Sequence, residues 1–92
     1  MPSLEGFRER INEIDSRIID ALIERTQIVS EVGAFKKENK MKIVDRKREK
    51  ELISARIRQA EGKLNPAFVK KLFETIIKSS RNEQKRIIRK KS

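Results

Sequence analysis

One continuous amphipathic stripe governs what this chain can fold into. From Leu4 to about Phe35 the apolar residues recur at spacings of three and four, which is the period of one α-helical face. These residues are Leu4, Phe7, Ile11, Ile14, Ile18, Leu22, Val29 and Val32. A helix of about 32 residues is roughly 48 Å long, which exceeds the diameter of a compact domain of this mass. The stripe therefore needs cover from other helices and, we expect, from a second chain.

The next segment predicts a connector and a second helix. Asn39 follows the last turn of the first helix and is expected to end it in a left-handed conformation. Residues 41–44 then read as a short extended connector. Asp45 is a suitable N-cap for a second helix, and Gly62 is expected to end that helix.

The remaining residues predict a third helix. Asn65 followed by Pro66 is typical of a helix start, and the apolar pattern continues through Ile88. The predicted fold is all-α, with one long, one short and one medium helix per chain. We expect residues 1–92 to form a single domain within an intertwined homodimeric helical bundle.

Composition excludes most catalytic chemistries. Without His or Cys the chain cannot build a Ser-His-Asp triad, a cysteine nucleophile, a disulfide framework or a His/Cys zinc site. A total of 24 Lys and Arg against 14 Asp and Glu gives a net charge of +10, which favours an anionic partner. Because the sequence shows neither a membrane-spanning run nor an apolar signal segment, we expect a cytoplasmic protein without a membrane partner.

Polar residues interrupt the apolar stripes of the first and third helices. Arg25 and Lys36 hold stripe positions in the first helix, and their spacing of eleven residues puts them within about 20° of one another. Ser80 and Gln84 do the same in the third helix, one turn apart. A single long cation can extend out of such a stripe into water. Four polar groups on two helices that pack together favour an interior site, where cations need carboxylates or a bound anion.

The start of the second helix adds a third group of charges. Asp45 and Glu49 suit a helix N-terminus, the first as a cap and the second as a favourable charge near the dipole. Arg48 carries the wrong sign for that place and precedes apolar Leu52 by one turn. Its presence suggests a negative ligand.

These residues resemble the all-helical class of chorismate mutase over essentially the whole chain. The motifs that carry the resemblance are Arg8-Glu9-Arg10-Ile11, Ile14-Asp15, Glu24-Arg25, Val32-Gly33, Lys36, Asp45, Arg48-Glu49, Phe73 through Ser80, and Gln84. The resemblance implies a pericyclic rearrangement of chorismate to prephenate in phenylalanine and tyrosine biosynthesis. It also implies that no cofactor and no metal take part.

The resemblance further implies a set of substrate-binding residues. They are Arg8, Arg25, Lys36, Asp45, Arg48, Glu49, Ser80 and Gln84. The three arginines would bind the substrate carboxylates and their surroundings, with Ser80 assisting. Lys36 and Gln84 would donate to the ether oxygen, while Glu49 would accept from the ring hydroxyl beside Asp45. The residues assigned to catalysis are Lys36, Gln84, Arg25 and Glu49.

Arg8 poses a geometric problem that is independent of the family. It lies 17 residues before Arg25, which is about 25 Å along one helix and a rotation of roughly 100°. The two side chains cannot bind one small molecule within one chain. Arg8 is therefore either a solvated surface charge or, as the resemblance implies, a residue contributed to the site of the partner chain.

Two other functions stay open. A pyruvate lyase acting on isochorismate uses a similar scaffold and cationic pocket, although the pair of Asp45 and Glu49 favours the mutase by analogy. A basic helical dimer could instead bind nucleic acid through the cations near the end of the chain, which are Lys85, Arg86, Arg89, Lys90 and Lys91. The absence of Trp and Tyr argues against that function, and we expect no nucleic-acid partner.

Overall fold

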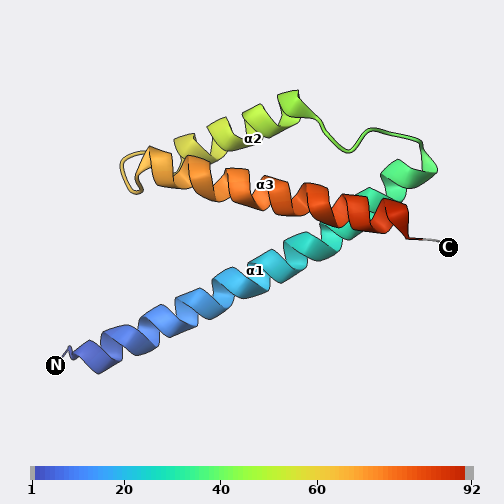
Figure 1. The fold of residues 1–92 in the computed structure, drawn as a ribbon. Helices are drawn as coiled ribbons and strands as arrows, with labels where there is room; N and C mark the ends of the chain where they lie inside the picture. The colour runs from blue at the N-terminus through green and yellow to red at the C-terminus, as the bar shows by residue number, and fades with distance from the viewer. Residues whose placement is uncertain (1, 91–92) are drawn as a thin grey trace.

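Three helices make up the regular structure of residues 2–90, the part of the chain that this computed structural model describes. Helix α1 spans Leu4–Glu38, α2 spans Arg46–Gln59 and α3 spans Pro66–Arg89. Helix α3 contacts both of the others and α1 runs on beyond it (Figure 1). The prediction of an all-α chain with one long, one short and one medium helix is confirmed. No helix in this range is long and apolar enough to cross a membrane.

The end of α1 differs from the sequence-based expectation. The helix continues to Glu38, and Asn39 is its C-cap with a φ of −97°, so Asn39 is not left-handed. The left-handed residue is Lys40, with a φ of 53°. The difference arises because both the backbone N–H and the side-chain amide of Asn39 donate to the carbonyl of Phe35, at 3.0 and 2.8 Å. These bonds hold Asn39 near the helical path, so the chain turns away one residue later.

The other helices begin where capping predicts. The Asp45 side chain accepts a hydrogen bond from the backbone N–H of Arg48 at 3.0 Å, and Asn65 caps α3 in the same way. Helix α2 stops at Gln59, before the expected end at Gly62. Gly62 lies in the following turn with a φ of 76°, a conformation that glycine adopts without strain.

Helix α1 approaches α3 tightly at Gly33, which is buried. A Cβ atom on Gly33 would lie 3.2 Å from the Cβ of Ile87 and 3.3 Å from the Cα of Gln84. Since these neighbours are main-chain or next to it, neither can move without moving α3. The missing side chain thus sets the distance between the two helices. Elsewhere on α3, Val69 and Ile77 form the buried apolar core.

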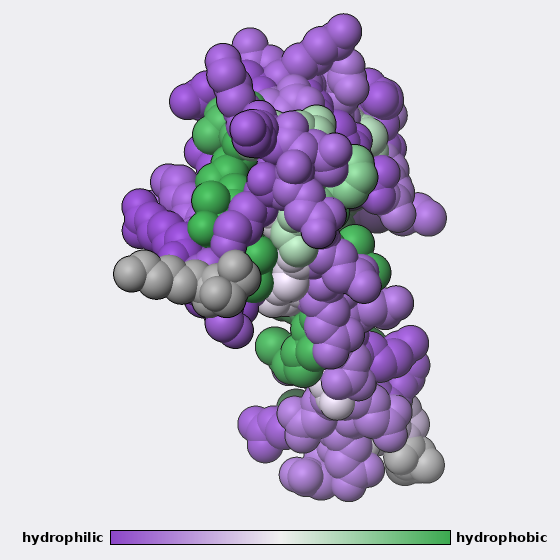
Figure 2. Space-filling view, turned by 90° about the vertical axis from the view of Figure 1, so that its right-hand side faces the viewer, coloured by the Kyte–Doolittle hydropathy of each residue, from purple (hydrophilic) through white to green (hydrophobic). Residues whose placement is uncertain are grey.

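The first half of α1 keeps its apolar face uncovered. The exposed fractions of its stripe residues range from 47% to 63%, and these residues are Leu4, Phe7, Ile11, Ile14 and Ile18. Figure 2 shows hydrophobic side chains at the surface, including where α1 continues beyond the other helices. The described chain measures 58 × 28 × 14 Å. A single chain therefore does not cover the apolar face of α1, as expected from the length of this helix. The homodimer stays a prediction.

We predict that Gly33→Ala destabilises the fold. Overpacking a tight contact costs about 1–3 kcal/mol, while the better helix propensity of alanine returns about 1 kcal/mol. The expected net loss in the free energy of unfolding is about 1 kcal/mol, and Gly33→Leu should lose more. Chemical denaturation followed by circular dichroism measures both. Ala34→Leu, at the exposed neighbouring position, is the control and should change little. An unchanged Gly33→Leu variant would contradict the proposed helix contact.

Candidate active site

A cavity of about 220 Å³ lies between the three helices. Its lining includes seven of the eight residues predicted to bind substrate, which are Arg25, Lys36, Asp45, Arg48, Glu49, Ser80 and Gln84. The apolar part of the lining is Val29, Val32, Ile43, Leu52 and Ile77. The volume equals that of roughly seven water molecules in the bulk liquid, which suits a small molecule rather than a chain segment. The structure thus gathers the predicted residues, while their roles toward a ligand stay predictions.

Arg25 is the half-buried cation of this cavity. It donates to the hydroxyl of Ser80, which in turn donates to the carbonyl of Ile76 at 3.0 Å. Burial, and secondarily the charge of Arg48, lower the pKa of Arg25 from its ordinary value. A guanidinium remains charged at neutral pH even so. Arg25 and the exposed Arg48 are therefore like charges that line the same cavity.

Neither of these arginines has a carboxylate partner within residues 2–90. The ion pairs of the described chain are Arg81 with Glu49 and Arg86 with Glu83. Asp45 and Glu49 line the same cavity, but neither forms an ion pair with Arg25 or Arg48 among these residues. Cations left without such a pair favour the binding of an anion.

Lys36 enters the cavity from α1 and is tied to the connector. Its Nζ atom donates to the carbonyl of Ile43 at 2.9 Å. An ammonium group carries three donors, so two remain for other partners. Because Asp45 both caps α2 and lines the cavity, the connector places Lys36 and the start of α2 next to one another.

Gln84 is the buried polar residue of the cavity. Only 8% of its surface is exposed, and its Oε1 atom has no hydrogen-bond partner among residues 2–90. A buried polar atom without a partner costs about 1–3 kcal/mol. Such an atom is normally satisfied by a water molecule or an ion, or it belongs to a functional site.

Arg81 is a cavity residue that sequence reasoning missed. It lies one turn after buried Ile77 on α3, so a stripe traced through that residue would have found it. Its guanidinium binds both carboxylate oxygens of Glu49, and the Nε to Oε2 distance is 2.8 Å. This hydrogen bonding is the main reason that the pKa of Glu49 lies below its usual range.

Arg8 lies outside the cavity. It is exposed near the start of α1, and one unbroken helix, Leu4–Glu38, carries both Arg8 and Arg25. Within one chain the cavity therefore lacks this predicted residue.

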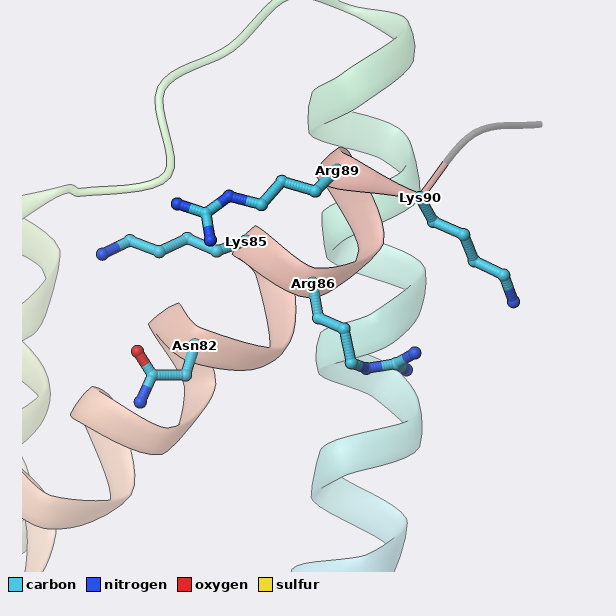
Figure 3. Close-up of a pocket in the computed structure, with 5 residues that line it drawn as sticks. All are labelled: Asn82, Lys85, Arg86, Arg89 and Lys90. Carbon is cyan, nitrogen blue, oxygen red and sulfur yellow. The ribbon is translucent and has the colours of Figure 1, made fainter.

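A second basic hollow lies at the end of α3. It has a volume of about 610 Å³ and is lined by Asn82, Lys85, Arg86, Arg89 and Lys90. Lys85 and Arg89 extend to one side of the helix, whereas Arg86 and Lys90 extend to the other (Figure 3). Their charges do not converge on one point. Lys91, the last cation of the proposed nucleic-acid surface, lies outside the described residues.

Fold and cavity together define a small helical domain in which arginine, lysine and a buried amide line one cavity. Residues 7–85 match the family model described as chorismate mutase type II, and the chain belongs to that family. The prediction of the family from sequence motifs is confirmed.

Two curated relatives are bifunctional chorismate mutase/prephenate dehydratases. The protein from Buchnera aphidicola subsp. Acyrthosiphon pisum (strain APS) is 35% identical over 89 residues, which cover 96% of this chain and 23% of the relative. The protein from Buchnera aphidicola subsp. Schizaphis graminum (strain Sg) is 34% identical over 94 residues, covering 98% and 24%. This chain thus spans about a quarter of their length. No solved structure matches it.

We predict that the fold loses stability in acid through two carboxylates. The pKa values of Glu49 and Glu83 are lowered, chiefly by hydrogen bonds from Arg81 and Arg86. Their contribution is complete above the ordinary glutamate pKa of about 4.3 and is lost as the pH falls through the lowered value.

Thermal melts of Glu49→Gln and Glu83→Gln against the parent chain test this. Each variant should melt below the parent at pH 7, and the gap should close toward pH 3, where the parent carboxyl is also neutral. A gap of equal size at both pH values would contradict the assignment.

Proposed function

We propose that this chain is a chorismate mutase that converts chorismate to prephenate in aromatic amino acid biosynthesis, in the cytoplasm. The observation that carries the proposal is that Arg25 and Arg48 line one cavity and that neither has a carboxylate partner in the described chain. Membership of the chorismate mutase type II family supports it. Chorismate is a small dicarboxylate, which is the charge type that such a cavity selects.

The reaction needs a cavity of suitable shape and charge, and it needs no proton transfer. The enolpyruvyl ether arm of chorismate must fold over the ring before the bonds exchange within one molecule. An enzyme accelerates such a step by holding the compact conformer and by stabilising charge that grows on the ether oxygen. Neither task needs His or Cys, which this chain lacks.

The two arginines would hold the substrate carboxylates. A planar guanidinium can engage a carboxylate with two parallel hydrogen bonds, so each arginine fixes orientation as well as position. Arg25 is already oriented by its hydrogen bond to Ser80. The like-charge repulsion between Arg25 and Arg48 would be relieved when a dianion enters.

Lys36 and Gln84 would donate to the ether oxygen. Lys36 supplies a full charge with donors beyond its bond to Ile43, and Gln84 supplies a buried neutral amide from α3. Glu49, held ionised by Arg81, would accept a hydrogen bond from the ring hydroxyl. All of these groups keep their protonation states through the reaction.

A second copy of the chain would complete the site. The exposed apolar half of α1 offers the surface for it, and exposed Arg8 lies on that same half. In the proposed homodimer each chain lends Arg8 to the cavity of its partner. The sum is two sites per dimer, each built from two chains.

We predict that Arg25→Ala and Lys36→Ala each lower kcat/KM for chorismate by at least about 100-fold. Loss of one preorganised donor typically costs about 10²–10³ in rate. The assay follows chorismate loss and identifies the product by chromatography. Lys37→Ala is the matched control, because Lys37 binds the carbonyl of Lys90 outside the cavity. Full activity in either cavity variant would refute the site, and salicylate with pyruvate from isochorismate would indicate the lyase instead.

We predict that two inactive chains restore one another. In a mixture of Arg8→Ala and Arg25→Ala chains, half of the dimers are mixed and each mixed dimer has one intact site of two. Activity should therefore recover to about one quarter of the parent value after subunit exchange. A mixture of Arg25→Ala with Lys36→Ala is the control, because both residues lie in the cavity of the same chain and no intact site can form. No recovery in the first mixture would argue against shared sites.

A further inference from the structure

We propose that Arg81 is a positioning residue for Glu49, holding that carboxylate away from the substrate-binding arginines and aimed at the substrate hydroxyl. The proposal deepens the proposed chorismate mutase function and rests on it. Arg81 itself is not assigned a bond to substrate.

The contact between the two side chains fixes the carboxylate in orientation. Arg81 on α3 donates through Nε to Oε2 of Glu49 at 2.8 Å, and through Nη2 to Oε1. A two-pronged bond of this kind restrains rotation of the carboxylate, which a single bond does not. The side chains are 26% and 17% exposed, so the pair is partly shielded from water.

The pair also separates two hollows. Glu49, Arg81 and Ile77 line both the cavity of about 220 Å³ and a groove of about 490 Å³ between α2 and α3. The ion pair is therefore part of the wall between them. A side chain in this place can hold Glu49 from the groove side while leaving the cavity free for a ligand.

The cations around Glu49 explain why its carboxylate needs to be held by Arg81. Arg25, Lys36 and Arg48 line the same cavity, and a carboxylate free to rotate would pair with one of them. Such a pair would neutralise a cation that the substrate requires. With Glu49 bound to Arg81, neither Arg25 nor Arg48 has a carboxylate partner among residues 2–90.

The surroundings of Glu49 define its response to pH. The charged residues that line the two hollows with it are Arg25 and Lys36 of α1, Asp45, Arg46, Arg48 and Lys50 around the start of α2, and Glu74, Lys78, Arg81 and Lys85 of α3. The hydrogen bond from Arg81 lowers the pKa of Glu49 more than any other influence, whereas burial and, to a smaller extent, Asp45 raise it. Without Arg81, Glu49 should take up a proton at higher pH.

The test is the pH profile of kcat and kcat/KM for chorismate in Arg81→Met, with circular dichroism at each pH to confirm folding. We expect the acid limb of kcat/KM to move up by about one to three pH units, because an opposite charge at close range shifts a carboxyl pKa by that amount. Arg81→Lys keeps the charge without the fork and should shift the limb less. Arg86→Met removes the comparable pair with Glu83 outside the cavity and should leave the profile in place.

The double variant separates positioning from general damage. In a Glu49→Gln background, Arg81→Met should change kcat/KM by less than about two-fold at any pH, since residues that act through one another are not additive. An unmoved acid limb in Arg81→Met, or a full loss that persists in the Glu49→Gln background, would overturn the proposal.

A measurement without substrate keeps this result distinct from failure of the proposed function. Carboxyl-carbon NMR titration of Glu49 in the parent chain and in Arg81→Met reports the coupling directly, and the pKa should rise in the variant. An unchanged pKa would overturn the inference whatever reaction the chain catalyses. Absence of prephenate from the parent chain at neutral pH would instead overturn the function.

Discussion

The placement of Arg25 and Arg48 around one cavity is the constraint on which the candidate site depends. Two like charges in a partly buried cavity are unfavourable unless something restrains or compensates them. Ser80 restrains the first by accepting its hydrogen bond, and the Asp45 cap fixes the start of the helix that carries the second. Of the two carboxylates that line the cavity, Glu49 is bound to Arg81 and Asp45 caps α2. In the proposed enzyme, binding of the substrate dianion would offset the free-energy cost of holding the two cations near one another.

Helix α3 converts that local arrangement into a site. It contacts both other helices and carries Ser80, Arg81 and Gln84 within little more than one turn. Its approach to α1 is limited at Gly33, three residues before Lys36 on the same helix. The contact between α1 and α3 therefore both packs the fold and sets the width of the candidate site. A change in the distance between α1 and α3 would move Lys36 relative to Gln84.

The sequence predicts the elements and most of the cavity for a physical reason. Polar residues on an apolar stripe must lie inside if the helix packs, so periodicity alone assigns Arg25, Lys36 and Gln84 to the interior. Arg81 was not predicted as a cavity residue, because one basic residue among the many charges of this chain is expected to lie in solvent. The ion pair between Arg81 and Glu49 joins two helices. Periodicity along one helix carries no information about such a contact. The shift of the left-handed residue to Lys40 is of the same kind, since it depends on two hydrogen bonds to one carbonyl.

The uncovered half of α1 has a consequence for the folding of an isolated chain. Short helices without tertiary contacts are only marginally stable in water, because most helical stability in proteins comes from packing. The turns around Ile11 and Ile14 receive little such support from their own chain, whereas those around Gly33 are clamped by α3. Hydrogen exchange in a lone chain would run fastest near Leu4 and slow progressively toward the cavity. In the proposed homodimer, the end that carries Arg8 would then become ordered last, as a second α1 packs against it.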